Sequence, residues 1–150
     1  MTPSNKPATF RILLVEDNPA DAHLVERALR RAHFAPDLSV VEDGMEAMDF
    51  LRRGGAHRDA RRPHLILLDL NIPGKDGHQV LGELKSDPYL TEVPVVIYTS
   101  STATKDVKTC YQLGANAYVR KPTDVADLFD VVSSIESFWL RTAILPSTPA

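Results

Sequence analysis

The 150-residue chain has a single cysteine and no long apolar run. With Cys110 alone, no intramolecular disulfide can form, and we expect a reducing compartment. No apolar segment approaches the roughly 20 residues of a membrane span, and residues 1–9 lack the apolar core of a signal peptide. The net charge of −3 favours neither nucleic acid nor an anionic membrane as partner. We therefore expect a cytoplasmic protein that binds neither.

Short apolar runs alternate with helical patterns along the chain. Residues 11–15 form an apolar run, and Asn18 and Pro19 after it favour the start of a helix. The same unit recurs, with further strands expected at 38–41, 65–68, 94–99 and 117–119 and further helices at 45–51, 79–85, 107–113 and 125–139. This alternation predicts an α/β fold with a doubly wound, five-stranded parallel sheet and helices on both faces. We expect the flavodoxin-like strand order 2-1-3-4-5.

The domain organisation follows from the two ends of this pattern. Residues 1–9 contain two prolines and little apolar content, which is typical of a disordered tail. We expect the folded domain over residues 10–141. Residues 142–150 form a C-terminal extension, which we expect to contain no output domain.

Polar side chains follow four of the five expected strands. Glu16 and Asp17 follow the first strand, Asp69 and Asn71 the third, Thr99 ends the fourth, and Lys121 follows the fifth. In a parallel sheet these carboxyl ends meet at one edge, where doubly wound proteins bind ligands. The sequence therefore predicts a functional site at this edge.

Clustered carboxylates repel one another, and their burial without compensation costs several kcal/mol. Mg²⁺, which prefers oxygen ligands, resolves this conflict. Asp17 and Asp69 are the expected carboxylate ligands, with Glu16 bound directly or through water and Asn71 supplying a backbone carbonyl. Asp69 can then act as a nucleophile toward phosphorus. The Lys121 ammonium and the Thr99 hydroxyl can stabilise the phosphoryl oxygens.

These stretches resemble the receiver domain of two-component response regulators. The similar segments are VEDN at 15–18, LLDLNIPGKDG at 67–77, VVIYTS at 95–100 and YVRKP at 118–122. The resemblance implies transfer of a phosphoryl group from a kinase histidine to Asp69 with Mg²⁺, and switching through Thr99 and Tyr118. Two positions depart from the common pattern: Glu16 stands where an aspartate is usual, and Ser100 where an alanine is frequent.

A narrower resemblance is to single-domain regulators that partner phytochrome-type histidine kinases. It is carried by the Glu-Asp-Asn start, the long loop before the third strand, and the ending IESFWLRTAILP at 135–146. It implies a phosphoacceptor signalling protein, not an enzyme acting on a separate substrate, with a phytochrome-type kinase as partner.

The last helix has more apolar residues than one sheet needs. A core stripe at helical spacing is expected from Leu128, Val132, Ile135 and Trp139. Residues expected off the stripe or beyond the helix are Phe138, Leu140, Ile144 and Leu145. We expect them to form a homodimer interface together with the fourth and fifth strands. The alternative is that the segment folds back over its own domain.

Other interpretations stay open at the level of single residues and of function. Glu16 and Asp17 could simply favour the positive end of a helix. A phosphohydrolase of similar fold would need an acid/base aspartate at position 71, which is asparagine. A flavin binder would need a Gly/Ser/Thr-rich loop after the first strand, and the acidic residues there would repel its phosphate. An arginine run at the end of the sheet opposite the site looks like a nucleic-acid patch, but we favour a role in solubility and in stabilising a helix C-terminus: Arg52, Arg53, Arg58, Arg61 and Arg62.

Overall fold

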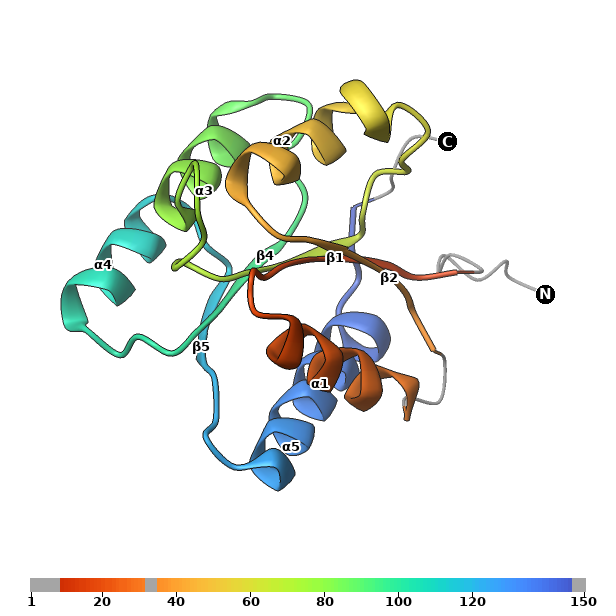
Figure 1. Cartoon of the computed structure of the whole chain (residues 1–150), viewed down its shortest axis with the longest axis vertical. Coiled ribbons are helices and arrows are strands. Elements are labelled where there is room, and N and C mark those ends of the chain that lie inside the picture. Colours follow the sequence, from red (N-terminus) through yellow and green to blue (C-terminus); the bar gives the residue numbers. More distant parts are fainter. Residues whose placement is uncertain (1–8, 32–34, 147–150) are drawn as a thin grey trace.

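The computed structural model describes residues 9–31 and 35–146 (Figure 1). Of the predicted N-terminal tail, all but Thr9 lies outside the described residues, as do residues 147–150 of the predicted extension. Five parallel strands form one sheet in the order β2-β1-β3-β4-β5. The predicted fold class and strand order are both confirmed.

The strands are β1 (Arg11–Val15), β2 (Asp37–Val41), β3 (Leu65–Leu68), β4 (Val95–Thr99) and β5 (Ala117–Arg120). The α-helices are α1 (Pro19–Arg30), α2 (Gly44–Arg52), α3 (Gly77–Ser86), α4 (Thr104–Gln112) and α5 (Val125–Glu136). Two short turns of other helical type follow α2 and α5: the 3₁₀ turn η1 (Gly55–His57) and the π-helical turn η2 (Ser137–Thr142). Each expected strand and helix is present, with its α-helical or strand ends within three residues of the expected ones.

The sheet separates two hydrophobic layers. Helices α1 and α5 cover one face, and α2, α3 and α4 cover the other (Figure 1). Alternate residues of β1 point to opposite layers: Ile12 and Leu14 pack toward α1 and α5, and Leu13 and Val15 toward α2 and α3. Strands buried on both faces read as continuous apolar runs, which is why β3 and β4 were recognisable from sequence.

Side-chain caps fix the starts of α1, α2, α3 and α5 at the carboxyl edge of the sheet. The Asn18 side chain accepts hydrogen bonds from the backbone at the start of α1, with Pro19 at the first helical position, as predicted. Asp76 and Gln79 form a reciprocal capping box at the start of α3. Next to this cap, a Cβ on Gly77 would lie 2.5 Å from the carbonyl oxygen of Asp69, so α3 can begin this close to the end of β3 only with glycine.

The last helix does not continue regularly to residue 139 as predicted. It changes at Glu136 into the π-helical turn, in which the Ala143 N–H donates to the Phe138 carbonyl over 2.7 Å. In such a turn residues five apart lie above one another, so Leu140 follows Ile135 into the core. Leu140 is therefore buried, and the expectation that it points away from the core is wrong.

The other three residues of the predicted interface set have different exposures. Phe138 is 51% exposed and Ile144 is 91% exposed, as expected for residues without a place in the core. Leu145 is half-buried. Trp139, which was assigned to the core stripe, packs half-buried at the margin of the α1/α5 layer.

A buried histidine ties β1 to β3 at the amino edge of the sheet. The Arg11 backbone N–H donates to His64 Nδ1 over 2.9 Å, and the His64 N–H donates to the Arg11 carbonyl over 2.8 Å. The imidazole also packs against the Phe10 ring, with 4.9 Å between centroids. Burial, with added repulsion from Arg11 and Arg61, lowers the pKa of His64 to about 4. The ring is therefore neutral in the folded protein at neutral pH.

This neutral histidine predicts a loss of stability in acid. The pKa of His64 falls from 6.5 in the unfolded chain to about 4 in the folded one, so the unfolded chain takes up the proton first. The stabilisation is complete above pH 6.5 and is lost as the pH falls toward 4, by about 3 kcal/mol in total.

His64→Asn keeps an acceptor for the Arg11 N–H without titrating. Urea unfolding at pH 7 and pH 4.5 should therefore show a smaller loss in this variant. His23→Asn, at an exposed position, is the control that should keep the wild-type loss. An unchanged loss in His64→Asn would contradict this account.

Candidate functional site

In-register pairing brings the predicted site residues together at the carboxyl edge. Val15 pairs with Leu68, so the residues that follow them, Glu16 and Asp69, lie side by side. The ladder continues past the strand ends, where the Asp69 N–H donates to the Val15 carbonyl over 3.1 Å. At the other side, the Lys121 N–H donates to the Thr99 carbonyl over 2.7 Å. The backbone thus positions all of these side chains without help from long loops.

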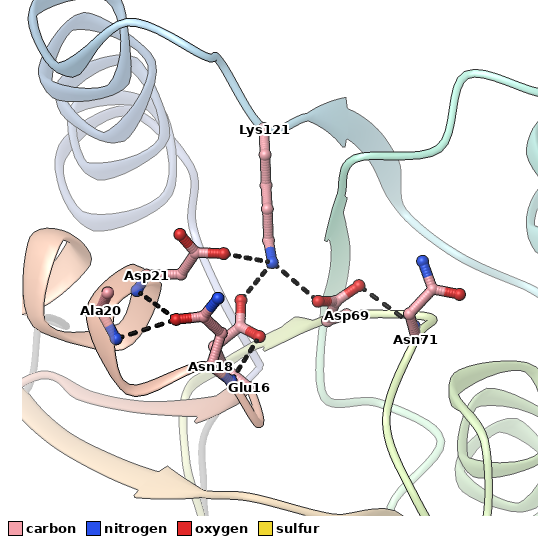
Figure 2. A network of polar contacts seen from close by, with 7 residues as sticks. All are labelled: Glu16, Asn18, Ala20, Asp21, Asp69, Asn71 and Lys121. Atoms are coloured by element: carbon pink, nitrogen blue, oxygen red, sulfur yellow. Dashed lines mark hydrogen bonds and ion pairs between the residues drawn. The ribbon is translucent and has the colours of Figure 1, made fainter.

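The ammonium of Lys121 is the centre of the site (Figure 2). Its Nζ donates to Asp69 Oδ2 over 2.7 Å and to Asp21 Oδ2 over 3.1 Å, and it also contacts Glu16 Oε1. An ammonium has three N–H bonds, and here each faces a carboxylate. The Lys121 and Glu16 side chains are only 9% and 1% exposed, so this ion pair is largely removed from water, whereas the Asp21 side chain is 35% exposed.

Burial acts in opposite directions on the pKa values of Lys121 and Glu16. Burial alone would lower the pKa of Lys121, but hydrogen bonds to Asp69 and Glu16 outweigh it and raise the pKa above its usual value. Burial raises the pKa of the Glu16 carboxyl well above its usual range, although Lys121 acts in the opposite direction. Lys121 therefore stays charged, and Glu16 is a carboxylate that further positive charge would stabilise.

Three carboxylates converge where such a charge could bind. Oxygen atoms of Glu16, Asp17 and Asp69 lie within 4.8 Å of one another. The donor set consists of oxygen alone, which fits a hard divalent cation. Asp17 is exposed while the other two are buried, so the group is open to solvent on one side. Asn71 lies beside it and donates its backbone N–H to Asp69 Oδ1 over 3.2 Å; the role of its carbonyl as a ligand stays a prediction.

The residues of the predicted switch lie on the adjacent strands β4 and β5. The Thr99 side chain is completely buried, and its hydroxyl has no hydrogen-bond partner among the described residues. An unsatisfied buried hydroxyl costs about 1–3 kcal/mol, so a further acceptor near it would be stabilising. Tyr118 is half-buried and its hydroxyl donates to the Ser101 carbonyl, over 2.9 Å, in the loop that follows Thr99. The structure therefore connects both residues to the same loop.

Two residues of the site were not found by sequence reasoning. Asp21, in the first turn of α1, was not singled out, although a capped helix that starts at this edge must present its first turn to the site. Tyr98 was taken only as part of a strand. Its ring lies 5.9 Å from the Lys121 Nζ, and its buried hydroxyl has no partner among the described residues. Burial raises the pKa of Tyr98 to about 12, so it stays protonated.

Comparison with known proteins agrees with this geometry. A family model described as the response regulator receiver domain matches residues 12–133. The chain is 46% identical over 144 residues to the response regulator Rcp1 of Synechocystis sp., covering 96% of this chain and 97% of Rcp1. In the described part of the chain, no helix is long and apolar enough to cross a bilayer.

Solved structures of response regulators are also similar to this chain. The chain is similar to the phosphorylated cyanobacterial phytochrome response regulator RcpA, with 48% identity and a TM-score of 0.91, over 93% of this chain and 100% of RcpA. It is also similar to the Mn²⁺-bound form of Rcp1, with 46% identity and a TM-score of 0.88, over 92% of this chain and 99% of Rcp1.

The carboxylate group predicts that a divalent cation stabilises the fold. Mg²⁺ at tenfold excess over its Kd should add about 1.4 kcal/mol and raise the melting temperature by about 3–6 °C, because the assembled site exists only in the folded state. Asp17→Ala should abolish this rise without lowering the melting temperature of the metal-free protein, because it also removes repulsion. Asp59→Ala removes an exposed carboxylate at the other edge and should keep the response. No Mg²⁺ response in the wild type at millimolar concentration would show that the site is misassigned.

Proposed function

The chain belongs to the response regulator receiver domain family, and we propose that Asp69 accepts a phosphoryl group from a sensor histidine kinase with Mg²⁺ present. The observation that carries this proposal is the contact between Lys121 Nζ and Asp69 Oδ2, beside three converging carboxylates. The ammonium is already in place to neutralise charge on a group attached to Asp69. Preorganised charge of this kind is the main contribution a protein makes to phosphoryl transfer.

The transfer replaces one bond to phosphorus by another. A carboxylate oxygen of Asp69 forms a bond to phosphorus while the bond from phosphorus to the kinase imidazole nitrogen breaks. Lys121 and the Thr99 hydroxyl contact two of the phosphoryl oxygens, and the Asn71 N–H stays on the carboxylate. When bound by Glu16, Asp17 and Asp69, Mg²⁺ would neutralise charge on a further phosphoryl oxygen.

Phosphorylation would be read out through Thr99 and Tyr118. A phosphoryl oxygen gives the Thr99 hydroxyl the partner that it lacks among the described residues, and this favours a shift of the end of β4. The loop after Thr99 moves with it, because Tyr118 is hydrogen-bonded to its Ser101 carbonyl. We propose a phytochrome-type histidine kinase as the phosphodonor, since RcpA, to which the chain is 48% identical, is described as a phytochrome response regulator.

Replacement of the acceptor tests this function directly. Asp69→Asn should abolish phosphoryl uptake from acetyl phosphate or from a kinase, because an amide is not a nucleophile toward phosphorus. Intact-mass measurement would show the added phosphoryl group on the wild type and on the control Asp59→Asn, but not on Asp69→Asn. A mass shift of equal size and stability in Asp69→Asn would overturn the assignment.

We propose further that two copies associate through β5 and the C-terminal helical segment. The expectation that β4 also contributes is wrong, because all five of its residues are buried. Strand β5 is an edge strand with β4 on one side only, and on it the Tyr118 N–H donates to the Tyr111 hydroxyl of α4 over 3.2 Å. The helices after β4 and β5 and the segment beyond them present exposed apolar side chains: Tyr111 on α4, Val125 on α5, Phe138 on η2, and Ile144 beyond it. Phe138 is held by an edge-to-face contact with Trp139, with 5.0 Å between ring centroids, so it is ordered without being buried.

Separate variants distinguish the interface from the core. Phe138→Asp should dissociate the dimer while the melting temperature stays close to that of the wild type. Leu140→Ala should lower stability by about 2–4 kcal/mol, because it leaves a cavity in the core. Met45→Asp changes an exposed apolar residue on α2, on the other face of the sheet, and should leave the dimer intact. Sedimentation of a wild type that remains monomeric at high micromolar concentration, with and without acetyl phosphate, would rule out the dimer.

A further inference from the structure

Asp21 is held in a fixed place beside the proposed phosphoacceptor. It is the third residue of α1, where the Asn18 Oδ1 accepts the backbone N–H groups of Ala20 over 2.9 Å and of Asp21 over 3.2 Å. This cap fixes the backbone from which the Asp21 carboxylate reaches Lys121 Nζ, 3.1 Å away. The positive end of the helix favours a negative charge at this position. Asp21 is therefore a preorganised carboxylate that faces the ammonium.

The three carboxylate partners of Lys121 differ in what else they can bind. Glu16 and Asp69 belong to the oxygen cluster that fits a divalent cation, and Asp69 is the proposed acceptor. Asp21 lies outside that cluster and contacts Lys121 directly. A bound metal ion would be coordinated by Glu16 and Asp69, and a phosphoryl group would be attached to Asp69, so each would weaken the contact of these carboxylates with Lys121. Asp21 is then the partner that neither ligand removes.

A lysine that lost its other partners would need such a restraint. Its side chain is long and flexible, so holding it in one conformation costs rotamer entropy. A buried ammonium also requires a partner, because desolvation without one is costly. From the first turn of α1, the Asp21 carboxylate can hold the Lys121 Nζ close to the position that the phosphoryl oxygens take during transfer to Asp69.

We propose that Asp21 is a positioning residue for Lys121, which keeps the ammonium directed at the phosphoryl group during transfer to Asp69. This inference rests on the proposed phosphoacceptor function. It assigns Asp21 no contact with the phosphoryl group and no place among the metal ligands. Its effect must therefore pass through Lys121, and this is what the experiment tests.

The test compares initial rates of phosphorylation by acetyl phosphate at saturating Mg²⁺, followed by intact mass. Asp21→Asn should slow the reaction about tenfold, the effect of one lost charge-assisted hydrogen bond. Asp127→Asn is the matched control. Asp127 is also the third residue of its helix, its N–H is also accepted by a capping side chain, and it is exposed, with no ion pair recorded within residues 9–31 and 35–146. This control should react at the wild-type rate.

A double-mutant cycle separates positioning from a general structural or electrostatic role. In a Lys121→Ala background, Asp21→Asn should change the rate less than twofold, because the group it positions is absent. A structural role would give the same tenfold loss in both backgrounds. Asp21→Asn should also keep the Mg²⁺-induced rise in melting temperature, which shows that the carboxylate cluster is still assembled. Asp21→Ser, which is uncharged and compatible with a helix start, repeats the test should the asparagine variant fold poorly.

The outcomes separate this inference from the function on which it rests. A wild type that takes up no phosphoryl group would overturn the proposed function and the role of Asp21 with it. If the wild type is phosphorylated and Asp21→Asn is phosphorylated at the same rate or faster, the role of Asp21 alone is overturned. A tenfold loss that persists without Lys121 would also overturn it.

Discussion

One ammonium, shared among carboxylates from two other parts of the chain, is the interaction on which the site depends. Lys121 follows the last strand, and its partners are Glu16 and Asp21, about 100 residues earlier, and Asp69, 52 residues earlier. Without it, buried carboxylates would repel one another at the edge of the sheet. Lys121 keeps the site assembled, and the exposed Asp17 leaves the carboxylate cluster open to solvent on one side, where a further positive charge could bind.

The sheet makes this arrangement possible with little dependence on loops. Parallel strands in register place Glu16, Asp69 and Lys121 at one edge, because each is the first residue after its strand. The close approach of α3 at Gly77 holds the segment after Asp69 against the end of β3. Rigid elements of this kind allow the site to be precise, since a charged group displaced by an ångström loses much of its effect.

The same edge also contains groups that the fold leaves unsatisfied. Within the described residues, the hydroxyls of Thr99 and Tyr98 are buried without hydrogen-bond partners, and Glu16 is desolvated. Sequences usually avoid such groups in a core, and their presence is typical of sites where stability is given up for function. Glu16 contacts the Lys121 ammonium and the Tyr98 ring lies 5.9 Å from it, so a new negative group at Asp69 would change the environment of both.

The sequence by itself determined the fold class, the strand order and the sheet edge at which the candidate site residues lie together. These properties depend on short-range patterns: apolar runs set the strands, capping residues set the helix starts, and strand ends in a parallel sheet must share an edge. Tertiary structure alone decided three further points. Asp21 joins Lys121 because α1 packs beside α5, Leu140 is buried because a π-helical turn shifts the phase of the last helix, and His64 is neutral because it is buried against Phe10. The contacts of Asp21 and His64 depend on how segments distant in the chain pack, and the burial of Leu140 depends on a change of helical type, which a regular helical spacing of apolar residues does not reveal.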